Sequence, residues 1–322
     1  MTSAALIGAF TVGAAYGYGS QRSAFCLSSG LRSTLDGDWT KVKALALAVA
    51  VQLLLLPAVF AAGWATPVLP PFMPIAGMAG GILFGLSMRW AGGCAAGVWY
   101  KLGAGDLGGL AAVLGMGLGA AAAETGPLSS LRVAVQSMLG MTPIAAPPLV
   151  LPLAGIAVLL LLSRTSDGSS GAWTWRRTGL WIGIVAAAAW PASALAGRRY
   201  GLAIIPGTSG LVAGLTARPF PVWDVVLLAG IVAGAWIAAR RSGPVRPRAG
   251  APAGLLKRFA GGLGLGVGAS VAAGCTVGQG LTGLGLLAPG SVVVMSGIFL
   301  GCTLAASAAR RGDRRASRMA RA

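Results

Sequence analysis

Residues 81–97 read GILFGLSMRWAGGCAAG, and residues 262–278 read GLGLGVGASVAAGCTVG. The two stretches become copies of one motif when Cys94 is superimposed on Cys275. Glycine then recurs thirteen and nine residues before the cysteine, one residue before it and three residues after it. The offset between the copies is 181 residues. A thiol in a glycine-rich, apolar setting therefore stands at matched points of two halves of the chain, which indicates an internal duplication.

The composition is that of a protein embedded in lipid. Of the 322 residues, 56% are hydrophobic and 10% are charged, and the mean hydropathy is +0.78. A soluble chain of this length could not hide so much apolar surface from water. The 52 glycines fit membrane helices that approach closely or are interrupted. The sequence predicts an all-α integral membrane protein.

Nine hydrophobic runs reach spanning length, since a span needs about 20 apolar residues and at least roughly 17. Moving the first four runs forward by 181 residues places them on the last four, which leaves the fifth as a connector. Four crossings return the chain to its starting side and the fifth crosses once more, so the second half must begin on the opposite side. This is an inverted repeat of the kind found in transporters. The runs are residues 2–19, 41–63, 73–90, 107–124, 146–163, 177–196, 221–240, 257–273 and 289–308.

The duplication also predicts the domain organisation. The first inverted repeat, with spans one to four, covers residues 1–126, and a connector that contains span five covers 127–176. The second repeat, with spans six to nine, covers 177–308, and a basic tail covers 309–322.

Four further stretches are too apolar and too rich in glycine for ordinary loops. We interpret them as re-entrant segments that dip into the membrane between spans. Irregular backbone is tolerated at that depth only where it is buried in protein or lines a cavity. We therefore expect the four segments to meet near the midplane and to form an hourglass-shaped path. They are residues 20–35, 91–105, 201–217 and 274–287.

The basic residues predict the orientation in the cell (inner or plasma) membrane. With the N-terminus outside, 21 of the 25 Lys and Arg residues fall on the cytoplasmic side, as does the C-terminus, and this agrees with the positive-inside rule. The net charge of +18 is then mostly a matter of topology, and we expect the tail to contact anionic lipid headgroups rather than nucleic acid. Arg198 and Arg199 are candidates for an outer anion funnel or for interfacial anchors. The residues placed outside are Arg132, Arg198, Arg199 and Arg218.

Several classes of chemistry have little material in this chain. There is no His, there are seven Asp and Glu residues, and the four Cys form no CxxC pair. These counts leave little for a metal centre or for general acid–base catalysis. The glycine-rich stretches lack the GK[ST] of a Walker motif. We expect no metal, no cofactor, no catalytic residue and no ATP hydrolysis by this chain.

Cys94 and Cys275 are the leading candidates for a functional site. Each follows a glycine, Gly93 or Gly274, at the expected tip of a re-entrant turn that opens a short helix. A helix N-terminus presents unpaired N–H groups and a partial positive charge, which favours an anion beside it. A thiol at that position adds a weak S–H donor. The alternative is that each cysteine is a small apolar residue that packs against glycine.

Two other cysteines have different settings. Cys26 lies in QRSAFCLSSGLR, residues 21–32, where Arg22, Phe25 and Arg32 suggest a cytoplasmic exit lined by cations and an aromatic ring. An inert loop thiol is the other interpretation of Cys26. Cys302 lies in FLGCTLAAS of the last run, where it is expected to serve helix packing. Gln279, four residues after Cys275, falls on the same face of a short helix and could donate an amide N–H to a substrate oxygen.

The QRSAFC segment and the paired AGGC and AGC motifs, with GCTVGQGLTGLG at the second, resemble the YeeE/YedE sulfur-transport family over nearly the whole chain. This resemblance implies an hourglass inverted-repeat fold and uptake of thiosulfate along the thiols of Cys275, Cys94 and Cys26. It also implies a possible partner, a separate TusA-like sulfur carrier in the cytoplasm. The chain departs from the family pattern at Ala24, where a basic residue is frequent, and at Thr276, where Asn is frequent.

Two alternative functions remain open from the sequence. One is a membrane sulfurtransferase that forms a persulfide on Cys94 or Cys275. The other is a permease for a selenium compound or another sulfur species, which would differ from a thiosulfate transporter only in its substrate.

Overall fold

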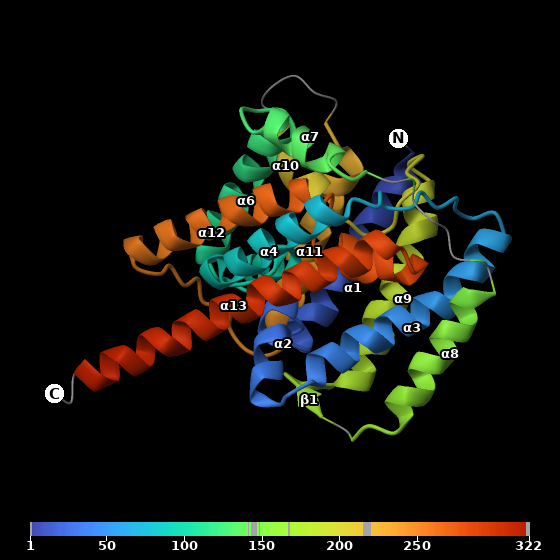
Figure 1. Ribbon diagram of the computed structural model, residues 1–322. Coiled ribbons are helices and arrows are strands. Elements are labelled where there is room, and N and C mark those ends of the chain that lie inside the picture. Colours follow the sequence, from blue (N-terminus) through green and yellow to red (C-terminus); the bar gives the residue numbers. More distant parts are fainter. Residues whose placement is uncertain are drawn as a thin grey trace.

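The computed structural model describes residues 2–140, 142, 147, 149–166, 168–214 and 220–319, and these residues are mostly helical (Figure 1). A two-stranded antiparallel hairpin, β1 (Ser169–Ser170) and β2 (Trp173–Thr174), is the only sheet in this part of the chain. The longer helices are α1 (Ser3–Arg22), α3 (Thr40–Ala61), α4 (Pro74–Ala91), α6 (Gly108–Glu124), α8 (Val150–Ser163), α9 (Trp175–Ala194), α11 (Val222–Arg240), α12 (Pro252–Val271) and α13 (Pro289–Met319).

Each of the nine predicted runs corresponds to one of these longer helices, and local signals account for several of their starts. Thr2 and Thr174 cap α1 and α9 through their side-chain oxygens. Proline opens α4 and α12, where its missing N–H costs nothing. The run predicted at 146–163 is shorter as a helix, since α8 begins at Val150, and residues 146 and 148 lie outside the described part. The tail predicted from residue 309 continues α13 as far as Met319.

The short segments occupy the four stretches predicted to be re-entrant. In the first half they are α2 (Leu27–Ser33), a 3-10 turn η1 (Thr34–Asp36) and α5 (Ala95–Gly103). In the second half they are α10 (Ile205–Ala213), a π-helix η3 (Gly278–Gly283) and a 3-10 turn η4 (Leu284–Leu286). Helix α7 (Ser129–Ser137) precedes α8. Residues 215–217 of the predicted third stretch, and Arg218 beyond it, lie outside the described residues.

The long helices pack in a regular set of pairs. Helix α1 packs against α11, and α3 packs against α9. Helix α6 packs against α12, and α4 packs against α13. Contacts of α1 with α9 and of α4 with α12 join these pairs into two groups of four helices. The short helices α5 and α10 each contact both α6 and α11 and so link the two groups into one bundle. The C-terminal part of α13 projects away from this bundle (Figure 1).

Glycine makes the closest of these contacts possible. On α6, a Cβ at Gly115 or Gly119 would overlap the carbonyl oxygen of Phe259 or Leu263 on α12. On α12, a Cβ at Gly266 would in turn overlap the backbone of α6. The two backbones therefore touch, as in membrane helices that associate through small residues.

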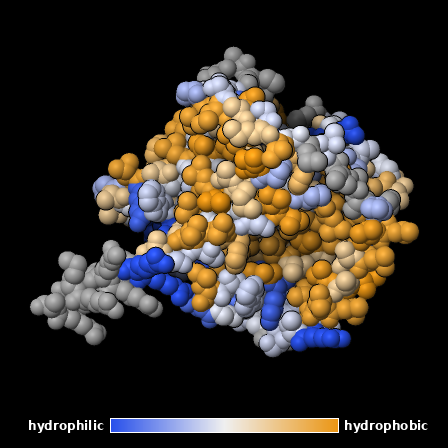
Figure 2. Space-filling model, in the orientation of Figure 1, coloured by the Kyte–Doolittle hydropathy of each residue, from blue (hydrophilic) through white to orange (hydrophobic). Residues whose placement is uncertain are grey.

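The surface of the bundle is apolar. Figure 2 shows hydrophobic residues over much of one face, with hydrophilic residues gathered mostly near its margins. On α8, for example, Leu160 and Leu161 are 63% and 68% exposed. By length and composition, α3, α11 and residues Pro289–Arg311 of α13 could each cross a membrane, and α6 with α7, bent by 67°, could form a fourth span. The structure is thus that of an all-α membrane protein, and the nine-span topology stays a prediction.

Candidate functional site

Cys94 caps the start of α5. Gly92, with φ of 81°, ends α4 in the left-handed conformation that glycine adopts freely, and Gly93 follows it. The carbonyl of Cys94 then accepts a hydrogen bond of 3.0 Å from the N–H of Val98. The prediction that this thiol stands at the opening of a short helix is confirmed, and the thiol is buried.

Cys275 follows a similar turn but opens a different helix. Ala273, 181 residues after Gly92, also has a positive φ, of 52°. The carbonyl of Cys275 accepts from the N–H of Gln279 at 2.8 Å, and the segment continues as the π-helix η3 instead of the ordinary short helix that we predicted. π-turns are frequent at functional sites. The two turns therefore match at the cysteine and diverge after it.

Cys26 lies next to the turn that holds Cys94. It precedes α2 and accepts a hydrogen bond of 3.0 Å from Gly30 N–H through its carbonyl. Its Sγ lies 3.9 Å from Sγ of Cys94, and both side chains are buried. The second turn reaches the same place, because Thr276, the residue after Cys275, lies beside Cys94. Three of the four thiols thus belong to one buried region between the short segments of the two halves.

Cys302 has a different environment. It lies on α13, and its Sγ is 3.8 Å from the carbonyl oxygen of Ser28 on α2. Its backbone also approaches Gly85 of α4. These contacts agree with the packing role that the sequence suggested for this cysteine.

Gln279 and Gly274 form part of the turn that holds Cys275. The Gln279 Nε2 atom donates to the carbonyl of Ala273 at 2.9 Å, and its Oε1 atom accepts from the hydroxyl of Ser291. A Cβ at Gly274 would lie 2.8 Å from Gln279 Nε2. The amide therefore braces the turn in this structure, and donation to a substrate oxygen stays a prediction.

Hydroxyl groups surround the thiols, and the sequence analysis did not single them out. Tyr16 on α1 lies within electrostatic range of Cys26, Cys94 and Cys275, and Ser20 lies one turn further along the same helix. Ser20 Oγ and Thr276 Oγ1 are buried and make no hydrogen bond of normal geometry within the described part of the chain. The four-residue spacing of Tyr16 and Ser20 in α1 was the available signal, but it does not distinguish a site from ordinary packing.

A cavity of about 820 Å³ leads to Cys275. We call it the Cys275 vestibule. It holds two arginines and one glutamate, so its lining carries a net positive charge, which suits an anion. Its lining includes Glu124, Arg132, Gln136, Arg198, Tyr200, Ile204, Ser270, Gly274 and Cys275.

A second cavity, of about 470 Å³, lies toward Cys26 and is called the Lys101 cavity. Its lining includes Gln21, Ala24, Tyr100, Lys101, Asp106, Arg248 and Arg258. Tyr100 lies beside Cys26, and the Lys101 ammonium donates to the carbonyl of Gly92. Arg22 does not line this cavity: its Nη1 atom donates to Ser242 Oγ at 2.8 Å.

The two cavities lie at opposite ends of the same helices. On α12, Arg258 lines the Lys101 cavity and Ser270 lines the vestibule. Twelve residues of helix at 1.5 Å per residue separate them by about 18 Å. The buried thiols lie between, because Cys275 belongs to one cavity and Cys26 neighbours Tyr100 of the other.

These features define the class: an α-helical membrane protein with a positively lined cavity at either end of the bundle and buried thiols between them. The family described as sulphur transport matches residues 22–304, and the chain belongs to this sulphur-transport family. It is 32% identical over 297 residues to the thiosulfate transporter TsuA of Escherichia coli (strain K12), and this alignment covers 84% of each chain. It is 31% identical over 304 residues to the thiosulfate transporter TsuA of Spirochaeta thermophila, and this alignment covers 86% of this chain and 91% of the relative.

Proposed function

We propose that this protein carries thiosulfate, or a closely related small sulfur anion, across the membrane through the region of Cys275, Cys94 and Cys26. One observation carries the proposal: cavities at opposite ends of α6 and α12 approach the same buried thiols. The names of the two relatives agree with transport of thiosulfate.

The chemistry of the buried region suits such an anion. A dianion that loses its water in hydrocarbon would face a prohibitive cost. Thiol and hydroxyl donors from Cys94, Cys275 and Tyr16 can replace part of that hydration without holding the anion too tightly to release it. Neutral donors of this kind let an anion pass, whereas a buried cation at the centre would trap it.

An inverted repeat accounts for the packing of the bundle. Under the 181-residue offset, α1 corresponds to α9 and α3 to α11, so the α1–α11 contact is exchanged with the α9–α3 contact. In the same way the α6–α12 contact is exchanged with the α13–α4 contact. This symmetry supports nine crossings, four re-entrant segments and an hourglass-shaped path in the cell membrane.

We expect the N-terminus to lie outside the cell and the C-terminus to lie in the cytoplasm. The physical reason is the excess of Lys and Arg on the loops that this orientation places inside. A reporter that is active only outside the cytoplasm should be active when fused before Met1 and silent when fused after Ala322. Activity of the C-terminal fusion would overturn this orientation and reverse the assignment of the two cavities.

The transport proposal is tested directly by uptake into proteoliposomes. Purified protein should admit labelled thiosulfate faster than protein-free vesicles, and a panel of sulfate, sulfite and selenium oxyanions should compete less well. Uptake no faster than that of empty vesicles, with correctly folded protein, would contradict the proposal.

A sulfurtransferase is the second candidate, and the 3.9 Å separation of the Cys26 and Cys94 thiols favours it. A thiolate would attack the outer sulfur of thiosulfate, form a cysteine persulfide and release sulfite. A second thiol at this distance could then accept the sulfur and pass it to a TusA-like carrier in the cytoplasm. The intact mass after turnover decides between the two, because a persulfide adds one sulfur atom and transport leaves the mass unchanged.

A further inference from the structure

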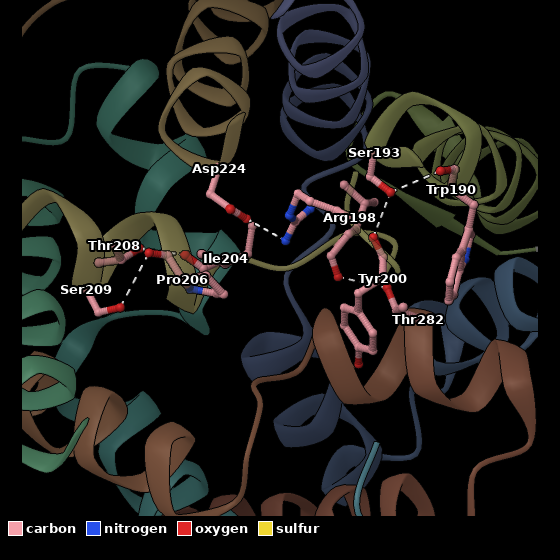
Figure 3. Close-up of polar contacts among 11 residues, drawn as sticks. Trp190, Ser193, Arg198, Tyr200, Ile204, Pro206, Thr208, Ser209, Asp224 and Thr282 are labelled. Carbon is pink, nitrogen blue, oxygen red and sulfur yellow. Dashed lines mark hydrogen bonds and ion pairs between the residues drawn. The ribbon is translucent and has the colours of Figure 1, made fainter. Parts of the chain in front are cut away.

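The loop between α9 and α10 holds Arg198 in a fixed position (Figure 3). Its Nη2 atom lies 2.8 Å from Oδ1 of Asp224, which is on the first turn of α11. Its guanidinium carbon lies 4.4 Å from the centre of the Trp223 ring. The Arg198 side chain is 21% exposed and that of Asp224 is 7% exposed, so the pair is largely withdrawn from water. Ion pairing and stacking together leave the guanidinium little freedom.

The same loop is tied to the turn that holds Cys275. The hydroxyl of Ser193 donates to the carbonyl of Tyr200 at 2.7 Å, and the hydroxyl of Tyr200 donates to the carbonyl of Gly278 at 2.6 Å. The Arg198 N–H donates to the carbonyl of Ser193 at 3.1 Å. The position of the guanidinium relative to Cys275 is therefore set by a short chain of hydrogen bonds.

Arg198 has one hydrogen-bond donor without an acceptor in the described part of the chain. Its Nη1 atom is buried and has no hydrogen-bond acceptor among the residues that the structure describes. Burial lowers the pKa of this guanidinium, but arginine stays protonated in proteins. Arg132, the other arginine of the vestibule, already donates to the carbonyl of Ala123 and to Gln136. Arg198 thus differs from Arg132 in having a buried N–H left to offer.

We propose that Arg198 is the residue that first binds the anion in the Cys275 vestibule, with Asp224 as its positioning residue. Arg198 would hold an oxygen of the anion through Nη1 while Nη2 stays on Asp224. The partial neutralisation by Asp224 keeps this binding weak enough for the anion to move on toward Cys275. The ligand class is a small oxyanion with a sulfonate-like face, since a planar guanidinium matches oxygen acceptors that an ammonium would contact only as a point charge. The inference rests on the proposed function and adds a specific entry site to it.

Arg199 provides a matched control. It is the next residue, carries the same charge and is exposed, but it does not line the vestibule. Its backbone carbonyl accepts a hydrogen bond of 2.9 Å from the N–H of Val68. Arg199→Met therefore removes an equal charge from the same loop without touching the proposed site.

In proteoliposomes, Arg198→Met should raise the KM for thiosulfate about tenfold or more with a smaller change in maximal rate, as for the loss of a charged hydrogen bond. Arg198→Lys should recover only part of the loss, and Arg199→Met should stay within about twofold of wild type. Arg198→Met leaves the carboxylate of Asp224 buried and unpaired. The double variant that adds Asp224→Asn has no unpaired carboxylate, so it should show the same increase in KM in a stably folded protein. Equal KM values for Arg198→Met and Arg199→Met would overturn the assignment.

A second readout does not require thiosulfate transport. Cys275 is labelled with two methanethiosulfonate reagents, one bearing a sulfonate and one bearing a trimethylammonium group, and the labelled site is mapped by mass spectrometry. Wild type should react faster with the anionic reagent, and Arg198→Met but not Arg199→Met should lower that preference. If Arg198→Met lowers the preference for the anionic reagent but the wild-type protein takes up no thiosulfate, the proposed function is contradicted and the anion site is still supported. Normal uptake with an unchanged preference and KM would contradict the anion site alone.

Discussion

Thiosulfate uptake should fall about ten- to a hundredfold when Cys94 or Cys275 is replaced by alanine. Each replacement removes the thiol at the tip of its turn, in a buried region that water cannot readily enter. A hydrogen bond to a charged group that is left unmade there costs roughly 1.5–3 kcal/mol. Initial rates in proteoliposomes, normalised to the amount of inserted protein, measure the effect.

Cys302→Ala is the matched control for this experiment. Cys302 is as buried as the other thiols, but its Sγ contacts the carbonyl oxygen of Ser28 on α2, and it lines neither cavity. Its loss should leave most of the uptake, since removal of one small side chain is a modest packing change. Wild-type rates for Cys94→Ala and Cys275→Ala would show that the paired cysteines only pack. A loss confined to Cys302→Ala would show that the path runs elsewhere.

The sequence predicted the helices well because their signals are local. An apolar run of spanning length, a threonine cap or a proline at the first turn determines where a helix begins, and all nine runs contain helices. The turn before Cys94 was equally readable, because glycine at positions 92 and 93 marks a break in the helix. The π-helix after Cys275 was not predicted, because the sequence there indicated only a short helix; in the structure Gln279 lies beside Gly274 at its start.

Properties that depend on tertiary contacts could not be predicted from the sequence. Nothing in the spacing of Cys26 and Cys94, 68 residues apart, indicates that their sulfurs are neighbours. Arg198 and Arg199 look equivalent in the sequence, and only the positions of Trp223 and Asp224 distinguish them. Tyr16 was overlooked for the same reason, since a tyrosine in an apolar helix carries no sign of what it faces.

Gly97→Ala should abolish most transport with a single added methyl group. A Cβ at this position would lie 2.8 Å from Sγ of Cys26 and 3.3 Å from Sγ of Cys94. The first distance is shorter than real Cβ contacts allow, so the thiol of Cys26 must move or the backbone must shift. Overpacking of this kind costs about 1–3 kcal/mol. We therefore expect uptake to fall tenfold or more, measured on protein that still reaches the membrane.

The duplication supplies the comparison, because Gly278 is the counterpart of Gly97 at the 181-residue offset. A Cβ there would have Tyr200 Oη as its nearest neighbour at 3.8 Å, an ordinary contact, so Gly278→Ala should lose far less uptake. If the clash with Cys26 is the cause, adding Cys26→Ala to Gly97→Ala should restore the thermal stability of the detergent-solubilised protein. Equal uptake by the two glycine variants would contradict the proposal that the path depends on the close approach of Cys26 and Cys94 at Gly97. Unequal uptake would mean that the two repeats contribute unequally to the path, because a Cβ at Gly97 would meet two thiols, whereas one at Gly278 would meet Tyr200.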